Sequence, residues 1–215
     1  MTETASGIIL RTRPLTETSL IVHWLTPELG RVATVAKGAR RPKSPFAGKL
    51  DLFYTADFSF IRSRRSELHT LREANLRETH VAIRENILKL QQAGYLAAFI
   101  EQTTEMESPL PEIFELARGF LPWLCGHEPR TQNVLALELK LLRELGLMPD
   151  LAETRLTPGV KKIARALLEN DWADSARLRP TSAQIHELQQ WLHGFLTVHL
   201  GRLPRGRAAA LAGES

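Results

Sequence analysis

The period of the hydrophobic residues changes near residue 80, and this change restricts the fold more than any other feature of the sequence. Before it, short apolar runs are separated by proline and glycine, as in strands joined by turns. We predict strands over residues 7–11, 19–25, 31–36, 52–61 and 67–76. Five short strands in about 75 residues fit a small closed barrel of the oligonucleotide-binding (OB) type better than a sandwich, which typically needs about seven.

After residue 80 the apolar residues recur at helical spacing. One stripe is predicted to let another helix approach closely, and it comprises Ile83, Ile87, Leu90, Gly94 and Ala97. A second helix is expected to start near Pro111 and to kink or end at Pro122. Residues 134–145 are apolar over most of the helix circumference, which predicts a central buried helix with Gly146 as its cap.

Two later helices carry start signals. Thr157 before Pro158 is predicted to cap one of them, and Thr181 with Gln184 forms a capping box before the other. The sequence therefore predicts an α+β protein, with an OB-type barrel over residues 1–80 and an all-helical domain over residues 81–215. The Ala- and Gly-rich end, residues 205–215, is expected to fray.

The positive charge is concentrated in the first domain. The net charge is only +4, but residues 1–80 carry 13 basic and 8 acidic side chains, while residues 81–215 carry 15 and 16. Between Arg31 and Lys49 there are six basic residues and no acidic one. Because glycine and proline keep this stretch out of a helix, we expect an exposed loop whose cations can meet phosphate groups.

We therefore predict a DNA-binding surface on the barrel, built from the first strand, this basic stretch and the tip of the last hairpin. In a small barrel these three places can fall on one side, as a groove that follows a sugar-phosphate backbone. The predicted contacts are Arg11, Arg13, Arg31, Lys37, Arg40, Arg41, Lys43, Arg62, Arg64 and Arg65. The alternative is a solvated loop that serves only solubility. The barrel aromatics either stack on bases or, more usually, fill the core; they are Trp24, Phe53, Tyr54, Phe58 and Phe60.

Signatures of several other classes are missing from the sequence. Cys125 is the single cysteine, which excludes an internal disulfide and a multi-thiolate zinc site and favours a reducing, cytoplasmic compartment. No signal peptide and no apolar stretch near 18 residues is visible, so no membrane association is expected. His186-Glu187 resembles the start of a metalloprotease helix, but Gln190 stands where the second ligand would be. We expect no enzyme activity, no cofactor and no metal.

Several segments in combination resemble the RecO family of bacterial recombination mediators. They are GIILRTRP at 7–14, LTPELGR at 25–31, AKGARRPKS at 36–44 and LELKLLRELGLMPDL at 137–151. The resemblance implies a protein that binds single- and double-stranded DNA and anneals strands coated by single-stranded-DNA-binding protein. It also implies that the protein helps RecR to load the recombinase, in the cytoplasm and at the nucleoid when engaged on DNA. Lys37, Arg40 and Arg41 fall on the family's basic loop.

Two departures from the family pattern concern the helical half. Many members carry a four-cysteine zinc ribbon after the Pro-Asp-Leu exit, but residues 152–180 contain no cysteine, so the zinc ribbon is expected to be absent. Members also carry arginines before the central helix that receive the acidic C-terminal tail of the single-stranded-DNA-binding protein, whereas residues 134–136 are apolar here. Arg130, Lys140 or Arg143 could take that role instead.

Two other functions stay open at the level of sequence. The rival class is a protein–protein adaptor whose basic barrel binds an acidic partner rather than DNA. A more remote option is a hydrolase that uses His186 and Glu187.

Overall fold

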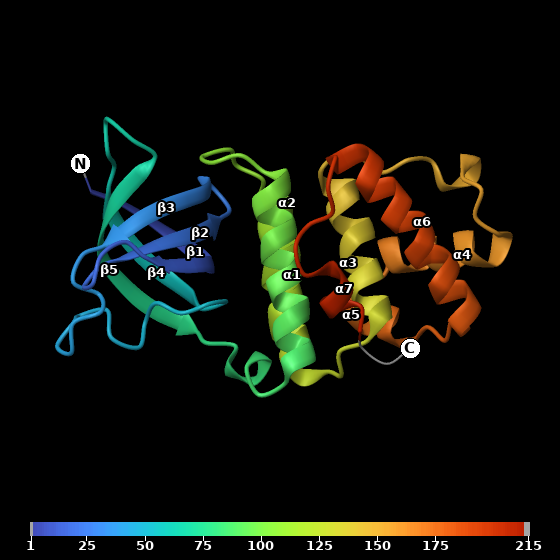
Figure 1. The fold of residues 1–215 in the computed structure, drawn as a ribbon, viewed down its shortest axis with the longest axis horizontal. Coiled ribbons are helices and arrows are strands. Elements are labelled where there is room, and N and C mark those ends of the chain that lie inside the picture. Colours follow the sequence, from blue (N-terminus) through green and yellow to red (C-terminus); the bar gives the residue numbers. More distant parts are fainter. Residues whose placement is uncertain (1, 213–215) are drawn as a thin grey trace. The chain divides into compact units, whose positions relative to one another are not determined.

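A computed structural model describes residues 2–212 of the chain (Figure 1). The chain forms two compact units. One comprises the residues up to Val81 together with Thr104–Arg118, and the other comprises Ala82–Thr103 together with the residues from Gly119 onward. Each unit is described by itself below.

The first unit contains a closed five-stranded barrel, which confirms the predicted fold class. Its strands are β1 (Thr2–Pro14), β2 (Leu20–Thr26), β3 (Gly30–Ala36), β4 (Thr55–Ile61) and β5 (Leu68–Glu78), in the order β1-β2-β3-β5-β4. Strand β1 is long enough to pair with β4 along its first half and with β2 along its second, with a bulge between Ile9 and Arg11. Parallel pairing of β3 with β5 closes the barrel.

Aromatic side chains fill the interior of the barrel. The Trp24 ring stacks on Phe58 at 4.1 Å between ring centroids, and Phe60 is fully buried beside them. The Trp24 Nε1–H donates to Thr34 Oγ1 at 2.9 Å, which satisfies the one polar atom of the indole. These aromatics therefore belong to the core and are not available to stack on bases.

Strand β4 is shorter than the sequence predicts. It begins at Thr55 rather than at residue 52, because Phe53 adopts a left-handed backbone with φ of 64°. The Phe53 N–H donates to the Ile9 carbonyl at 2.8 Å, and Ile9 N–H donates to the Tyr54 carbonyl at 2.9 Å. Residues 52–54 thus form a turn that hydrogen-bonds to Ile9 of β1 before β4 starts.

A short segment from beyond the barrel sequence, the strap (residues 104–108), packs on β3. Met106 forms a parallel bridge with Arg31, and the Glu107 N–H donates to the Arg31 carbonyl at 2.8 Å. Gly30 permits this approach: its φ is +65°, and a Cβ there would lie 2.0 Å from the Ser108 carbonyl oxygen. Within the first unit, the strap occupies the part of β3 that β5 does not pair with.

The second unit is helical, as predicted. The helices after the barrel are α1 (Ile87–Thr103), α2 (Pro111–Gly126), α3 (Thr131–Glu144), α4 (Pro158–Glu169), α5 (Trp172–Arg177), α6 (Ser182–Leu200) and α7 (Arg207–Ala210), with 3-10 turns at Val81–Ile83 and Leu151–Glu153. Helix α2 begins in the first unit and ends in the second. Helix α3 is buried from Thr131 to Leu142 and contacts α4, α5 and α6, which confirms the central buried helix. Helix α2 continues through Pro122 to Gly126. None of the helices described in residues 2–212 is long and apolar enough to span a membrane.

The predicted contact stripe of α1 is wrong in two places. Ile87 is 64% exposed, and nothing lies within 4 Å of the position that a Cβ on Gly94 would occupy. The helix instead buries Tyr95, Phe99 and Ile100. Ile83 and Ala97 of the predicted stripe are buried, so the prediction fails at Ile87 and Gly94 only.

The C-terminal segment is also more ordered than predicted. Arg207 is 5% exposed, and its guanidinium binds the carboxylate of buried Glu138 at 2.6 and 2.9 Å. The hydroxyl of Tyr95 donates to the same carboxylate at 2.6 Å. Residues 205–212 therefore form part of the packed helical unit, and residues 213–215 lie outside the described residues.

Candidate nucleic-acid interface

The basic loop, residues 37–43, leaves the barrel directly after β3 and runs through consecutive turns. The Arg41 N–H donates to the Gly38 carbonyl and the Ser44 N–H donates to the Arg41 carbonyl, both at 3.1 Å. Gly38 has φ of +70°, a conformation that favours glycine. The four cationic residues of the loop, Lys37, Arg40, Arg41 and Lys43, are all exposed.

Two sets of contacts fix the loop to the barrel. Phe46, 6% exposed, is part of the barrel core, and Ala39 packs against the same core. The Arg40 N–H donates to the Thr18 carbonyl at 2.9 Å, and its Nη1 donates to the Thr16 carbonyl at 3.2 Å. The loop that carries the cations is therefore already ordered. Less conformational entropy of the loop is lost when it binds a phosphate chain.

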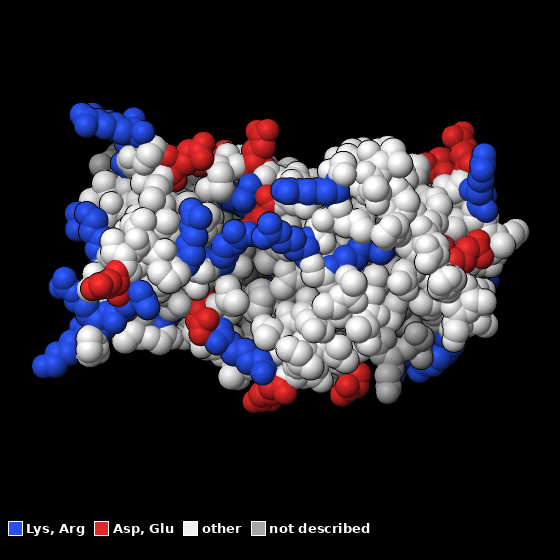
Figure 2. Space-filling view, viewed as in Figure 1, with Lys and Arg blue, Asp and Glu red and all other residues white. Residues whose placement is uncertain are grey.

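The cations of the basic loop are not neutralised by the protein itself. Among residues 2–212, none of Lys37, Arg40, Arg41 and Lys43 forms an ion pair with a carboxylate. Figure 2 shows Lys and Arg side chains projecting from the part of the barrel where Figure 1 draws the loops between β3 and β4. Unpaired, exposed cations are the groups that exchange counterions for DNA phosphates.

The strand register separates the predicted DNA contacts into two groups. Leu20 pairs with both Pro14 and Ala36, so Arg13 and the basic loop share one end of the β1–β2–β3 sheet. Ala33 pairs with Leu68, which places the β4–β5 hairpin, residues 62–67, toward the other end of β3. Since β3 has seven residues, the two ends are roughly 20 Å apart. The basic loop and the hairpin therefore lie toward opposite ends of β3, and one bound strand would have to run along the barrel to reach both.

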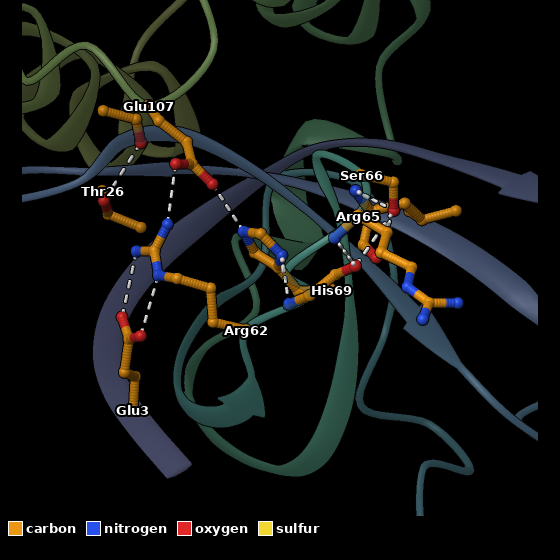
Figure 3. Close-up of polar contacts among 10 residues, drawn as sticks. Glu3, Thr26, Arg62, Arg65, Ser66, His69 and Glu107 are labelled. Atoms are coloured by element: carbon orange, nitrogen blue, oxygen red, sulfur yellow. Dashed lines mark hydrogen bonds and ion pairs between the residues drawn. The ribbon is translucent and has the colours of Figure 1, made fainter. Parts of the chain in front are cut away.

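At the hairpin end, Arg62 is already engaged (Figure 3). Its Nε and Nη2 bind the Glu3 carboxylate at 2.8 and 3.0 Å, and its Nη1 binds Glu107 of the strap at 2.7 Å. The hydrogen bond to Glu3 raises the pKa of Arg62 and lowers that of Glu3. Arg31, predicted as a DNA contact, is half-buried and donates from Nη2 to the Thr104 carbonyl. Arg64 and Arg65 at the tip are exposed.

His23 lies on β2, close to several of the predicted DNA contacts. It lies opposite Arg11 on the neighbouring strand, with Arg13 two residues farther along. Burial, followed by the cations of Arg13, Arg11 and Arg31, lowers the pKa of His23 to about 4. Its imidazole is therefore neutral near pH 7 and adds no positive charge to those of Arg11 and Arg13.

The helical unit contains a cavity of about 690 Å³ at the N-terminus of α3. Its charged lining residues are Glu128, Arg130 and Arg179, so the net charge of the lining is positive. The other lining residues are apolar or uncharged polar: Leu88, Pro129, Leu178, Pro180, Ile185, Asn86, Thr131 and Gln132. Arg130 is the exposed N-cap residue of α3, where the helix dipole adds positive potential. The sequence prediction included Arg130 but missed Arg179, because only the fold brings residues 130 and 179 together.

The structure places the other two predicted tail-docking residues differently. Lys140 is 6% exposed, and its Nζ donates to the carbonyls of Leu168 and Asn170 at 3.0 and 2.6 Å. Burial, with Arg143 nearby, lowers its pKa to about 8. Arg143 is exposed but donates to the Leu168 carbonyl at 2.9 Å and pairs with Glu144. Of the three, only Arg130 lines the cavity.

The residues of the remote hydrolase hypothesis have other contacts. The Glu187 carboxylate accepts hydrogen bonds from Thr157 N–H and Oγ1 at 2.6 and 3.0 Å, which fixes the start of α4, and His186 is exposed. Over residues 2–212, no three His, Cys, Asp or Glu side chains are grouped so that they could hold a metal ion.

Two family models match the chain: Recombination protein O N terminal over residues 1–80, and Recombination protein O C terminal over residues 84–155. Curated relatives agree. The DNA repair protein RecO of Rhodopirellula baltica is 34% identical over 143 residues, or 66% of this chain and 53% of that protein. The RecO proteins of Alkaliphilus metalliredigens and Bacillus subtilis are each 32% identical over 146 residues, 67% of this chain and 58% and 56% of theirs. The aligned part thus spans little more than half the length of these relatives.

Proposed function

This chain belongs to the RecO family, and from that premise we propose that it acts in DNA repair and recombination by binding single- and double-stranded DNA. In this proposal it anneals complementary strands coated by single-stranded-DNA-binding protein and, with RecR, helps to load the recombinase. The chemistry is that of backbone recognition and protein docking, without a covalent step.

The observation that carries the proposal is the basic loop. Lys37, Arg40 and Arg41 are exposed, have no carboxylate partner among residues 2–212, and stand on a loop anchored in the core by Phe46. Arg13 extends the same end of the barrel. Such an arrangement binds phosphate without reading sequence, which suits a protein that must act on any gap or strand.

The test is a salt titration of DNA affinity by fluorescence anisotropy. We expect the variant Lys37→Ala, Arg40→Ala, Arg41→Ala to bind a labelled oligonucleotide more weakly and to lose about 0.7–0.9 in log–log salt slope for each lost phosphate contact. The matched control is Arg155→Ala, Lys162→Ala, Arg165→Ala, which removes the same charge from exposed positions of the helical unit. Unchanged affinity and slope in the first variant, or an equal loss in the control, would reject the basic loop as the DNA site.

Membership of the RecO family also suggests an occupant for the cavity at the N-terminus of α3. We propose that Arg130 and Arg179 receive the acidic C-terminal tail of the single-stranded-DNA-binding protein, while Leu88 and Ile185 contact its apolar side chains. Arginine suits a terminal carboxylate because its fork can bind both oxygens. Lys140 and Arg143 take no direct part in this proposal, because neither of them lines the cavity.

A tail peptide measures this second site. Arg130→Ala and Arg179→Ala should each weaken binding of a labelled acidic tail peptide about tenfold, in line with charged hydrogen bonds worth about 1.5–3 kcal/mol. Arg177→Ala is the control, since Arg177 is exposed and pairs with Asp174 outside the cavity. Equal peptide affinity in the Arg130 variant and the control would place the tail elsewhere.

A further inference from the structure

The hairpin end of the barrel contains an anion-binding site that an acidic side chain of the protein occupies. In the first unit, the Glu107 carboxylate lies between two donors: Oε1 is 2.5 Å from His69 Nε2 and Oε2 is 2.7 Å from Arg62 Nη1 (Figure 3). The His69 side chain is only 2% exposed, so its Nε2 has one direction in which to find a partner. The pair of donors forms a fixed cradle for two oxygens of one anion.

The hydrogen bonds of His69 fix the tautomer that this cradle needs. The Ser63 N–H donates to His69 Nδ1 at 3.2 Å, so Nδ1 is the acceptor and Nε2 carries the proton. His69 also stacks on Phe60 of the core, with 5.2 Å between the ring centroids. A rigid, neutral N–H donor and a guanidinium therefore face the same point, whether or not a carboxylate lies there.

Glu107 contacts Arg62 through a different nitrogen from the other carboxylate on this guanidinium. Glu3 binds Arg62 Nε and Nη2 through two parallel hydrogen bonds, whereas Glu107 makes one contact with Arg62 Nη1 and one with His69 Nε2. Glu107 also has φ of 55°, a strained conformation for a residue other than glycine. An incoming anion can therefore replace Glu107 without breaking the Arg62–Glu3 pair.

We propose that this cradle is a second phosphate-binding site for the nucleic-acid backbone and that Glu107 masks it. The site consists of Arg62 Nη1 and His69 Nε2, and the exposed Arg64 and Arg65 lie on the same hairpin. A phosphate diester presents two non-bridging oxygens, as the carboxylate does. The inference rests on the DNA-binding function proposed above, and it predicts that the strap lowers DNA affinity at this end of the barrel.

The test is a double-mutant cycle at positions 107 and 62. DNA affinity is measured by fluorescence anisotropy with a labelled oligo-dT. Glu107→Gln keeps the shape of the side chain and removes its charge, so we expect about two- to fivefold tighter binding at low salt and a salt slope steeper by about 0.7–0.9. Arg62→Ala alone should change the affinity less than twofold, because its guanidinium is neutralised in the wild type. Arg62→Ala in the Glu107→Gln background should abolish the gain.

Glu105→Gln is the matched control, since it removes the same charge from an exposed position of the same strap. The proposal is overturned if Glu107→Gln and Glu105→Gln bind DNA equally, because the effect would then be long-range charge alone. It is also overturned if Glu107→Gln lowers the melting temperature and leaves DNA affinity unchanged, because Glu107 would then only stabilise the packing of the strap. If the wild type binds DNA and loses binding in the basic-loop variant, failure here leaves the proposed function standing; absence of any DNA binding by the wild type rejects both.

Discussion

At the scale of single residues, the Arg207 guanidinium forms a buried ion pair in the helical unit. It binds Glu138 through two hydrogen bonds while only 5% exposed, and Tyr95 completes the carboxylate's shell. We predict that Arg207→Ala lowers the free energy of unfolding by about 3–5 kcal/mol, because it leaves a buried charge without its partner. Urea denaturation followed by circular dichroism measures this, and exposed Arg205→Ala should stay within about 0.5 kcal/mol of the wild type. Similar midpoints for the two variants would contradict the prediction.

His23 gives a prediction about pH at the same scale. Its pKa is about 4 in the folded chain, against 6.5 for an unperturbed histidine. As the pH falls below 6.5, the unfolded chain binds a proton that the folded chain does not, so stability decreases down to about pH 4. The slope due to one group is at most about 1.4 kcal/mol per pH unit. Denaturation series between pH 7 and 4.5 should show a shallower decrease for His23→Gln than for the wild type; parallel curves would count against this.

Residue-level prediction from sequence succeeded for one of the two predicted helix caps: Thr157 is the N-cap residue of α4, but its side chain makes no capping hydrogen bond and instead contacts Glu187, 30 positions away. The capping box of Thr181 and Gln184 is present in both directions, because its geometry is decided within four residues. It did not foresee the partners of Arg62, which lie at positions 3 and 107, or the burial of Lys140. A cation counted as a DNA contact from sequence is only available if the fold leaves it without a carboxylate.

At the scale of elements, the basic loop depends on one apolar anchor. Phe46→Ala removes the side chain that joins the loop to the barrel core but leaves every cation in place. We predict about two- to tenfold weaker DNA binding with an unchanged salt slope, because the number of phosphate contacts stays the same while the loop must be ordered on binding. Leu71→Ala on β5 is the control for core damage, and it should leave DNA affinity unaltered. A reduced slope in Phe46→Ala would mean that contacts, not order, were lost.

The elements themselves followed from hydrophobic period and turn residues, and all five strands were placed correctly to within a few residues, apart from the longer β1. What the pattern did not predict was the strap. Residues 104–108 have no strand periodicity, and they pack on β3 because Gly30 leaves room for the Ser108 carbonyl. Non-local pairing of this kind depends on a missing side chain in another element, which no local pattern contains.

At the scale of the whole molecule, the proposed DNA site lies in the first unit and the proposed tail site in the second. Two sites engaged on one protein-coated strand should act together, since the second binding event becomes intramolecular. We predict that excess free tail peptide weakens binding to coated DNA at least tenfold and leaves binding to bare DNA unaltered. Competition titrations on both ligands measure this, with Arg130→Ala insensitive to the peptide. Equal effects of the peptide on coated and bare DNA would indicate a shared site.

The Arg207–Glu138 pair also bears on the order of events during synthesis. The partners are 69 positions apart, and the barrel strands end at Glu78, well before either. A ribosome adding about 5–20 residues per second releases Glu138 roughly 3–14 s before Arg207. Throughout that interval the nascent helical unit has an acid at its centre without its cation, whereas the five barrel strands are already complete. Folding in the cell should therefore be sequential, with the barrel formed first and the helical unit closed only when α7 emerges.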